Sequence, residues 1–277
     1  MIRVITLFLV GALSTAAQAQ DRFITLSSTT STQDSGLFGH ILPLFKAASG
    51  IDVHVVAVGS GQALAIGERG DADAVLVHDR PGEDKFVAEG YGIDRRDVMY
   101  NDFVIVGPKS DPAAIRGLKD AHEAFRRIAA KAALFASRGD DSGTNRMELR
   151  LWNSAGLAPD AHSTWYRKLR QGMGATLNIA AGLEAHTLTD RATWADFKNR
   201  QDLEILTEGD PALFNPYSSI LVNPAKWPQV KAGDARIWHE WLTTKPGLDA
   251  ITSYRIVTAY RIAGEQLFFP PRLAAAH

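Results

Sequence analysis

The sequence contains no cysteine, which excludes disulfide bonds, a thiolate nucleophile, an iron–sulfur cluster and a cysteine-based zinc site. Neither sign of charge is in excess, since 30 lysines and arginines face 31 acidic residues, and this balance excludes charge-driven binding to nucleic acid or acidic membranes. No Gly-x-x-x-x-Gly-Lys-Ser/Thr loop and no Gly-x-Gly-x-x-Gly turn is present. We therefore expect no cofactor and no nucleic-acid partner.

What the chain does contain is the composition of a globular protein: 277 residues, 45% hydrophobic and 22% charged, enough for one large domain or two lobes. The first residues have the three parts of a secretory signal: a basic start at Arg3, the apolar run Val4–Leu13, and small residues at Ala17 and Ala19. We expect residues 1–19 to be a cleaved signal peptide and the mature protein to be periplasmic. The alternative is an N-terminal anchor that is never cut.

No later run reaches the roughly 18 apolar residues of a membrane helix. A lipid anchor would need a cysteine after the signal, so we expect no membrane anchor.

Strands and helices alternate along the remaining chain. Apolar β-prone runs predict strands over residues 23–26, 51–58, 74–77, 103–108, 133–136, 203–206 and 218–222. Helical spacing predicts a helix capped by Asp34 or Ser35 and ended by Gly50, and further helices over residues 63–68, 121–131, 146–155, 172–185, 230–242 and 246–253. Residues 191–197 fit a strand or a short helix. This order predicts two α/β lobes with parallel sheets flanked by helices, joined by crossings near residues 100–104 and 216–222.

Three of the turns between a strand and a helix share one chemical character. They are Ser28–Ser31, Gly59–Gly61 and Ser137–Thr144, and each combines hydroxyls with small residues just before a helix. The first turn of a helix has unpaired N–H groups and a positive dipole end, so it can hold an anion. Strand-to-helix turns of a parallel sheet lie at one edge, where ligands bind. The three turns together predict an anion site.

Arg138 is the one charged donor in these turns that suits an oxyanion, because its planar guanidinium presents a fork of N–H groups. The alternative role is an ion pair with Asp140 or Asp141 in the same turn. The two acids cannot face an anion themselves, so we expect them to orient the turn or to fix Arg138.

No set of residues indicates catalysis or a bound metal. Asp140–Gly143 superficially resembles the surroundings of a serine-protease nucleophile, but none of the histidines has a matching context, and Gly59–Gly61 lacks the Gly-x-Ser-x-Gly spacing. His78 and Asp79 lack metal-ligand spacing and favour a structural role. We expect neither enzymatic activity nor a metal site.

The order of these motifs resembles that of TupA-like proteins, the tungstate-binding components of bacterial ABC importers. The matching runs cover nearly the whole mature chain: Ser28–Leu37, Val58–Ala63, Gly70–His78, Met99–Pro108, Ser137–Thr144, Gly172–Leu177, Thr187–Arg191 and Gly264–Phe268. Three positions depart from the family pattern, namely Ser28 and Ser60, which stand where threonine is common, and His186, which stands where tyrosine is common. The hydroxyl exchanges keep the donor, whereas His186 bears on the contact from the second lobe.

The resemblance implies a type II periplasmic binding protein, with residues 21–103 and 217–277 in one lobe and residues 104–216 in the other. It implies an anion held in the cleft between the lobes by Thr29 or Thr30, Ser60, Arg138 and Thr144. Ser137, Ser142 and the N–H of Gly143 are expected to help. The implied partners are an ABC permease and its ATPase, and the protein itself is expected to be a monomer.

The alternatives for the ligand are molybdate, phosphate and sulfate on the same fold. An enzyme on the same scaffold is a third, less favoured reading.

Overall fold

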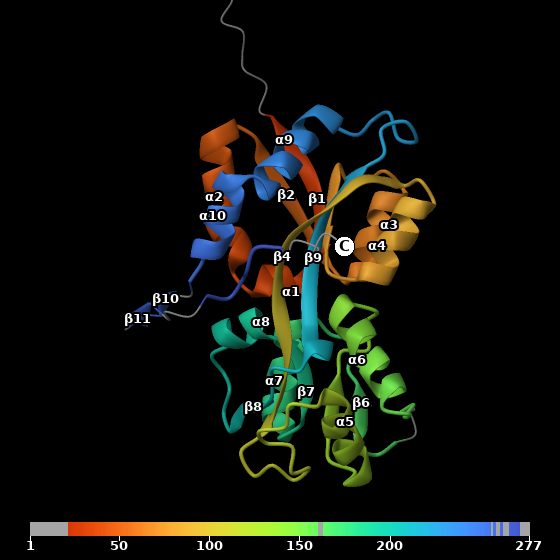
Figure 1. The fold of residues 1–277 in the computed structure, drawn as a ribbon, viewed down its shortest axis with the longest axis vertical. Coiled ribbons are helices and arrows are strands. Elements are labelled where there is room, and N and C mark those ends of the chain that lie inside the picture. The colour runs from red at the N-terminus through yellow and green to blue at the C-terminus, as the bar shows by residue number, and fades with distance from the viewer. Residues whose placement is uncertain (1–21, 160–162, 256, 259–260, 263–265, 272–277) are drawn as a thin grey trace, which may run out of the picture.

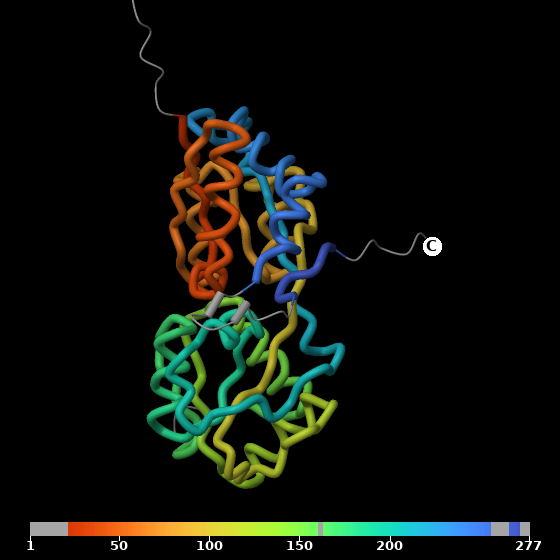
Figure 2. Tube along the Cα trace, turned by 90° about the vertical axis from the view of Figure 1, so that its left-hand side faces the viewer, coloured from red at the N-terminus to blue at the C-terminus, as the bar shows by residue number. Residues whose placement is uncertain are grey.

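The computed structural model describes residues 22–159, 163–255, 257–258, 261–262 and 266–271. The expected signal peptide, residues 1–19, lies outside this range. Two lobes are stacked along the long axis of the molecule, and both views show the chain crossing between them (Figures 1 and 2). No helix in the described part combines the length and apolarity that crossing a membrane requires.

The first lobe, at the top of Figure 1, holds the elements from both ends of the described chain. They are β1 (Phe23–Thr29), α1 (Thr30–Asp34), α2 (Leu37–Ser49), β2 (Asp52–Val58), α3 (Ser60–Glu68), β3 (Ala74–Val77), α4 (Arg80–Ala88), α9 (Ala232–Thr243) and α10 (Lys245–Ser253). The short antiparallel pair β10 (Val257–Thr258) and β11 (Arg261–Ile262) projects to the left in Figure 1, at the level where the lobes meet.

The second lobe holds the elements from the middle of the chain. They are α5 (Ala121–Ala130), β5 (Phe135–Ser137), α6 (Gly143–Ser154), β6 (Tyr166–Lys168), α7 (Met173–Leu183), β7 (Thr187–Asp190), α8 (Arg191–Asp196), β8 (Leu203–Thr207) and the 3₁₀ turn Pro211–Leu213. Two long strands, β4 (Gly92–Pro108) and β9 (Phe214–Val222), connect the lobes.

One sheet runs through the molecule in the order β2-β1-β3-β9-β4-β7, with β8 also paired to β4. The pairs of β1 with β2 and with β3 are parallel, as the three strand–helix units at the start of the sequence predict. Strands β4 and β9 run antiparallel to each other and to their neighbours, and a smaller parallel pair joins β5 to β6. The carboxyl ends of β1, β2 and β5 lead directly into the three turns that the sequence singles out.

Each lobe has its own buried apolar clusters. In the first lobe, Phe45 and Trp238 meet edge to face with ring centroids 4.9 Å apart, and in the second lobe Phe125 and Trp152 do so at 4.3 Å. The second-lobe helix α5 shows how the sequence forms these cores. It buries Ala121, Ala124, Phe125 and Ile128, which share one helical face, and Asp120 caps its first turn.

The helix expected after Asp34 or Ser35 is wrong in detail. Gly36 has φ +77° and separates α1 from α2, and it caps α2 through its left-handed backbone. Thr29 caps α1 by accepting a hydrogen bond from the Thr32 N–H. Residues 191–197, for which the sequence left two readings, contain the short helix α8, capped by Asp190.

Candidate oxyanion-binding site

The first turn joins β1 to α1. Its Thr29 hydroxyl makes bonds within the turn, whereas its Thr30 hydroxyl faces Arg138 of the second lobe. The Thr29 hydroxyl accepts from the Thr32 N–H at 3.2 Å and also contacts the hydroxyls of Thr32 at 2.8 Å and Ser31 at 3.3 Å. Thr30 Oγ1 accepts from Arg138 Nη2, which reaches it from the second lobe at 2.9 Å. Because that bond uses a lone pair of Thr30, the hydroxyl proton of Thr30 is still available to a ligand.

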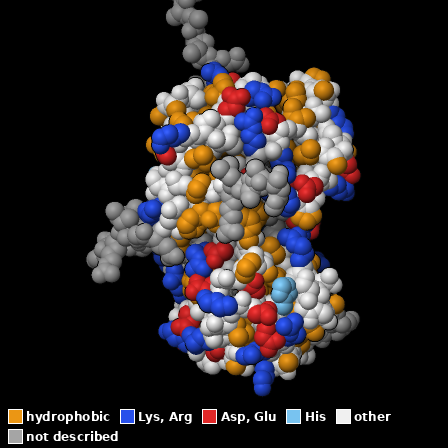
Figure 3. All heavy atoms as spheres, viewed as in Figure 1, with side chains coloured by type: hydrophobic (Ala, Val, Ile, Leu, Met, Phe, Trp, Pro, Cys, Tyr) orange, Lys and Arg blue, Asp and Glu red, His pale blue; other side chains and the backbone are white. Residues whose placement is uncertain are grey.

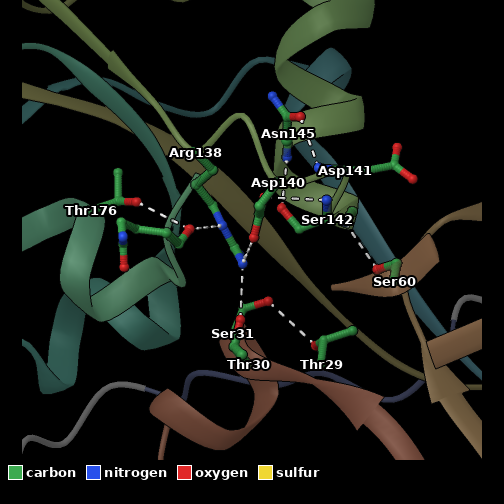
Figure 4. A network of polar contacts seen from close by, with 12 residues as sticks. Thr29, Thr30, Ser31, Ser60, Arg138, Asp140, Asp141, Ser142, Asn145 and Thr176 are labelled. Atoms are coloured by element: carbon green, nitrogen blue, oxygen red, sulfur yellow. Dashed lines mark hydrogen bonds and ion pairs between the residues drawn. The ribbon is translucent and has the colours of Figure 1, made fainter. Parts of the chain in front are cut away.

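Arg138 lies at the centre of the cluster and is only 1% exposed (Figure 4). Its Nη2 donates to Thr30 and, at 2.6 Å, to Asp140 Oδ2, while its Nε donates to the Gln171 carbonyl at 3.3 Å. Its buried Nη1 has no hydrogen-bond partner among the described residues. A buried guanidinium nitrogen without an acceptor is costly, so an incoming anion would stabilise it.

The second and third turns meet at the start of α6. Ser60 Oγ accepts from the Gly143 N–H at 3.0 Å, a bond that joins the two lobes, and leaves the Ser60 proton available (Figure 4). Thr144, one residue further on, is 1% exposed, and its Oγ1 has no partner in the described part of the chain. Ser60 and Thr144 therefore present hydroxyl donors at a helix N-terminus.

Two predicted residues of the third turn have their hydroxyls engaged elsewhere. Ser142 Oγ caps α6 by accepting from the Asn145 N–H at 3.2 Å. Ser137 Oγ donates to Glu148 Oε2 at 2.7 Å, and burial raises the pKa of Glu148. Both hydroxyls help to build the turn, but only Ser137 gives its proton to the protein, whereas Ser142 accepts a bond as Thr30 and Ser60 do.

The acids of the third turn are occupied by protein donors. Asp140 accepts from Arg138 and, through Oδ1, from the Ser142 N–H at 3.2 Å. Asp141 accepts two bonds from Arg146, at 2.8 and 2.7 Å, and these bonds lower the pKa of Asp141. Arg138 thus makes the ion pair with Asp140 that was one of the two roles weighed from the sequence, and its Nη1 is left without a partner among the described residues.

The start of α7 is a part of the cluster that the sequence did not include among the donors. Its N-cap, Gly172, makes no side-chain capping bond, and a Cβ on Gly172 would lie 3.7 Å from the Thr30 side chain. The Gly174 N–H of this start donates to Asp34 Oδ2 of the first lobe at 3.1 Å, and the sequence Gly172-Met173-Gly174 is the signal that could have indicated this helix start.

His78 lies behind the cluster as a neutral, hydrogen-bonded group. Asn215 donates through Nδ2 to Asn101 at 2.6 Å, so its Oδ1 accepts from His78 Nδ1 at 2.9 Å. His78 Nε2 is then the acceptor for the Ser31 hydroxyl at 3.1 Å. Burial lowers the pKa of His78 to about 4, which keeps the ring neutral. Ser31 is therefore excluded as a donor to an anion.

His186, the departure from the family pattern, faces the interior of the second lobe. Its Nδ1 lies 3.1 Å from the Leu134 carbonyl, and burial lowers its pKa. A Cβ on Gly107 of β4 would lie 2.6 Å from the His186 ring, so the imidazole packs against β4.

A group with metal-ligand chemistry occurs elsewhere, at Asp120, His122 and Asp210. The carboxylates already serve the backbone, since Asp120 accepts from the Glu123 N–H, and Asp210 from the N–H groups of Ala121 and Ala212. These bonds account for the cluster as a set of helix caps.

A cavity of about 610 Å³ lies at the strand crossing and includes none of the predicted donors. Its lining includes Tyr100, Asp102, Arg191, Glu208 and Phe214. Hydrophobic side chains gather where the lobes meet on the face shown in Figure 3, whereas charges of both signs are interspersed over the second lobe. A small oxyanion needs many donors close together, so the donor cluster locates the site better than cavity size does.

A two-lobed α/β fold with donors from both lobes at their junction defines a substrate-binding protein. The model of the PBP superfamily domain matches residues 14–246. The chain belongs to this superfamily and, within it, to the TupA-like substrate-binding proteins.

Two solved structures and one further relative support the assignment of the chain to this family. The tungstate ABC transporter structure from Geobacter sulfurreducens has 51% sequence identity, covers 84% of this chain and 98% of its own, and has a TM-score of 0.77. The tungstate-binding protein TupA from Desulfovibrio alaskensis G20 has 39% identity, covers 90% of this chain and 99% of its own, and has a TM-score of 0.74. The tungstate-binding protein TupA of Peptoclostridium acidaminophilum is 42% identical over 233 residues, which is 83% of this chain and 81% of that protein.

Proposed function

We propose that the protein is the periplasmic receptor of an ABC importer and binds tungstate between its lobes. The observation that carries the proposal is the pair of buried, unpartnered donors, Arg138 Nη1 and Thr144 Oγ1, beside hydroxyls contributed by the other lobe. The relatives named as tungstate-binding proteins support this choice of ligand.

In the proposed site, Arg138, Thr144, Thr30 and Ser60 donate to the four oxygens of the anion, and the Gly143 N–H lies beside them. Thr29, Ser137 and Ser142 hold the turns through the bonds already described. Hydrogen bonds to a charged group contribute roughly 1.5–3 kcal/mol each, so four or five donors can support tight binding after the cost of ordering the lobes.

The available groups select the protonation state of the ligand. Arg138 can only donate, Thr30 and Ser60 already accept a bond from the protein and so direct their protons to a ligand, and the nearby carboxylates already accept from protein groups. A fully deprotonated dianion such as tungstate or molybdate matches such a site. Phosphate carries a proton near neutral pH and would need an acceptor, so it is the weaker candidate.

The proposal also covers the lobe boundaries, the closure of the lobes and the export of the protein. Residues 21–103 and 217–277 form one lobe, residues 104–216 form the other, and closure around the anion favours the state that the permease and its ATPase engage. Residues 1–19 direct export and are removed, and the mature protein is an unanchored monomer without catalytic activity.

Titration calorimetry of the mature protein with tungstate, molybdate, sulfate and phosphate tests the proposal. We expect tight 1:1 binding of tungstate and no measurable phosphate binding. Absence of heat and of a thermal shift with all four anions would overturn the function.

Arg138→Ala tests the placement of the site. It removes the only guanidinium of the cluster, so tungstate affinity should fall at least tenfold while the far-ultraviolet circular dichroism is unchanged. Arg126→Ala, on the exposed face of α5 where Arg126 pairs with Glu123, is the matched control and should bind as the wild type does. Wild-type affinity in Arg138→Ala would show that the anion binds elsewhere.

A further inference from the structure

A group of charged residues joins the lobes beside the donor cluster. Asp79 precedes α4 in the first lobe and is 1% exposed. Arg146 and Arg150, one turn apart on α6 of the second lobe, both reach it: Arg146 Nη1 lies 2.5 Å from Asp79 Oδ2, and Arg150 Nη1 lies 3.1 Å from Asp79 Oδ1. These three residues are called the interlobe clasp below.

The clasp is connected to the proposed anion-binding turn through Arg146. The Nε and Nη2 atoms of Arg146 donate to the two carboxylate oxygens of Asp141, and its Nη1 donates to Asp79. Asp141 has φ +57°, a conformation uncommon for a residue other than glycine, and lies between Arg138 and Thr144 in sequence. One guanidinium therefore fixes a strained residue of the anion-binding turn and also reaches the opposite lobe.

The first lobe makes room for these side chains with two glycines. A Cβ on Gly61 would lie 2.4 Å from both Arg146 Nη2 and Asp141 Oδ2, and a Cβ on Gly82 would lie 2.6 Å from Asp79 Oδ2 and 3.0 Å from Arg146 Nη1. In each case the nearest polar atoms are ends of flexible side chains, so an alanine would displace the ion pairs before it displaced the backbone. Gly61 and Gly82 thus bound the space that the clasp occupies.

The clasp bonds exist only when the lobes are together. Every described hydrogen bond to the Asp79 carboxylate comes from Arg146 or Arg150 on the other lobe. The pair is partly shielded, because the side chains of Asp79 and Arg146 are 1% and 28% exposed. Charge-assisted bonds in such a place are stronger than those of a fully exposed pair.

We propose that the clasp Asp79–Arg146–Arg150 is a set of positioning residues that holds the lobes closed, fixes the anion-binding turn and sets the rate at which the anion leaves. This inference rests on the proposed function, since it assigns the clasp to the same site. No clasp residue donates to the anion; the three act through lobe closure and through Asp141.

The kinetic test uses tungstate and stopped-flow fluorescence of the protein. Asp79→Asn, Arg146→Gln and Arg150→Gln should each speed tungstate dissociation, by about tenfold for Asp79→Asn, with the association rate changed less than about twofold. The double variant Asp79→Asn with Arg146→Gln should speed tungstate release by less than the product of the two single effects, because both substitutions remove the same Asp79–Arg146 bond, whereas the Asp79–Arg150 and Arg146–Asp141 bonds are each lost in one of them. Arg126→Gln, which breaks an exposed pair within the second lobe, is the control and should leave both rates unchanged. Wild-type dissociation in all three single variants, or additive effects in the double variant, would overturn the proposal.

A second measurement does not depend on tungstate. The chain has no cysteine, so Lys85→Cys on α4 and Asn153→Cys on α6 place one spin label on each lobe. Double electron–electron resonance should show longer distances between the two spin labels in ligand-free protein that carries Asp79→Asn or Gly82→Ala. The control variant Gly39→Ala should show wild-type distances, since a Cβ on Gly39 meets nothing within 4 Å. Unchanged distances in both test variants would overturn the clasp, even in a protein that binds tungstate. Longer distances in a protein that binds no tungstate would retain the clasp and reject the proposed function.

Discussion

At the scale of single residues, the hydroxyls of the site differ in whether they donate a hydrogen bond to the protein or only accept one. Thr30 and Ser60 accept from Arg138 and Gly143 and keep a proton to donate, whereas Ser137 gives its proton to Glu148 and Ser31 gives its proton to His78. The sequence identifies hydroxyl-rich turns but does not tell these two groups apart. The difference depends on Glu148 and His78, which come from other parts of the chain.

Thr144→Val tests the unpartnered hydroxyl directly. Valine keeps the shape and removes the donor, so tungstate affinity should fall about tenfold or more, as for loss of one hydrogen bond to a charge. The ligand-free protein should be no less stable, because a buried polar atom without a partner is removed. Calorimetry measures the tungstate affinity, and denaturant unfolding measures the stability of the ligand-free protein.

Thr187→Val is the matched control for Thr144→Val. The Thr187 hydroxyl is buried and donates to the Ala136 carbonyl at 2.7 Å, so its loss should reduce the free energy of unfolding by about 1–3 kcal/mol and leave affinity unchanged. The reverse pattern, with affinity lost at Thr187 and retained at Thr144, would contradict the assignment of donors.

His78 should make the stability of the protein depend on pH. The pKa of His78 in the folded state is about 4, below the value of about 6.5 for an unperturbed histidine. Above pH 6.5 the ring is neutral in both states and its contribution to stability is complete. As pH falls from 6.5 towards 4, the unfolded chain takes up the proton first, so the free energy of unfolding falls.

The measurement is denaturant unfolding of the wild type and His78→Gln between pH 4 and 7.5. The difference between the two curves isolates His78 from the carboxylates that titrate in the same range. The variant should lose less stability on acidification, and two parallel curves would show that His78 is charged or exposed in the folded protein.

At the scale of helices and strands, the sequence predicted best where a pattern is local. The strands that begin the first lobe and the amphipathic helix α5 follow directly from apolar periodicity. Helix α4 was missed because it begins Arg80-Pro81-Gly82, which is typical of a turn, although proline is well placed in the first turn of a helix.

The strand predicted over residues 103–108 is the end of a much longer one. The first half of β4 is polar, and its register with β9 shifts between Ile93 and Arg96 and again between Asp97 and Met99. Pairing with β9 from the other end of the chain makes this half a strand, and such long-range pairing leaves no local pattern.

Ser142→Ala tests the role of the α6 cap. Loss of the bond to the Asn145 N–H should lower the free energy of unfolding by about 1 kcal/mol, while tungstate affinity changes less than about threefold. Ser154→Ala, at the last residue of the same helix, is the control and should change neither quantity. A tenfold loss of affinity in Ser142→Ala would make Ser142 a direct donor instead of a cap.

At the scale of the whole molecule, the two lobes share the long strands β4 and β9, and polar contacts also join them. Thr30 with Arg138, Ser60 with Gly143, and Thr193 with the Ser31 carbonyl all join residues far apart in the sequence. The class of fold follows from the alternation of strands and helices, and it is confirmed. That the three hydroxyl-rich turns come together could be inferred from their place at the carboxyl ends of strands. The distances between their donors could not, because those distances depend on how the two lobes close.

The most direct test is anomalous diffraction, at a tungsten absorption edge, from crystals of the mature protein grown with tungstate. We expect one strong peak between the lobes, within hydrogen-bond distance of Arg138 Nη1 and Thr144 Oγ1 from one lobe and of the Thr30 and Ser60 hydroxyls from the other. A peak at another location, such as the cavity at the strand crossing, or no peak at all, would contradict the account.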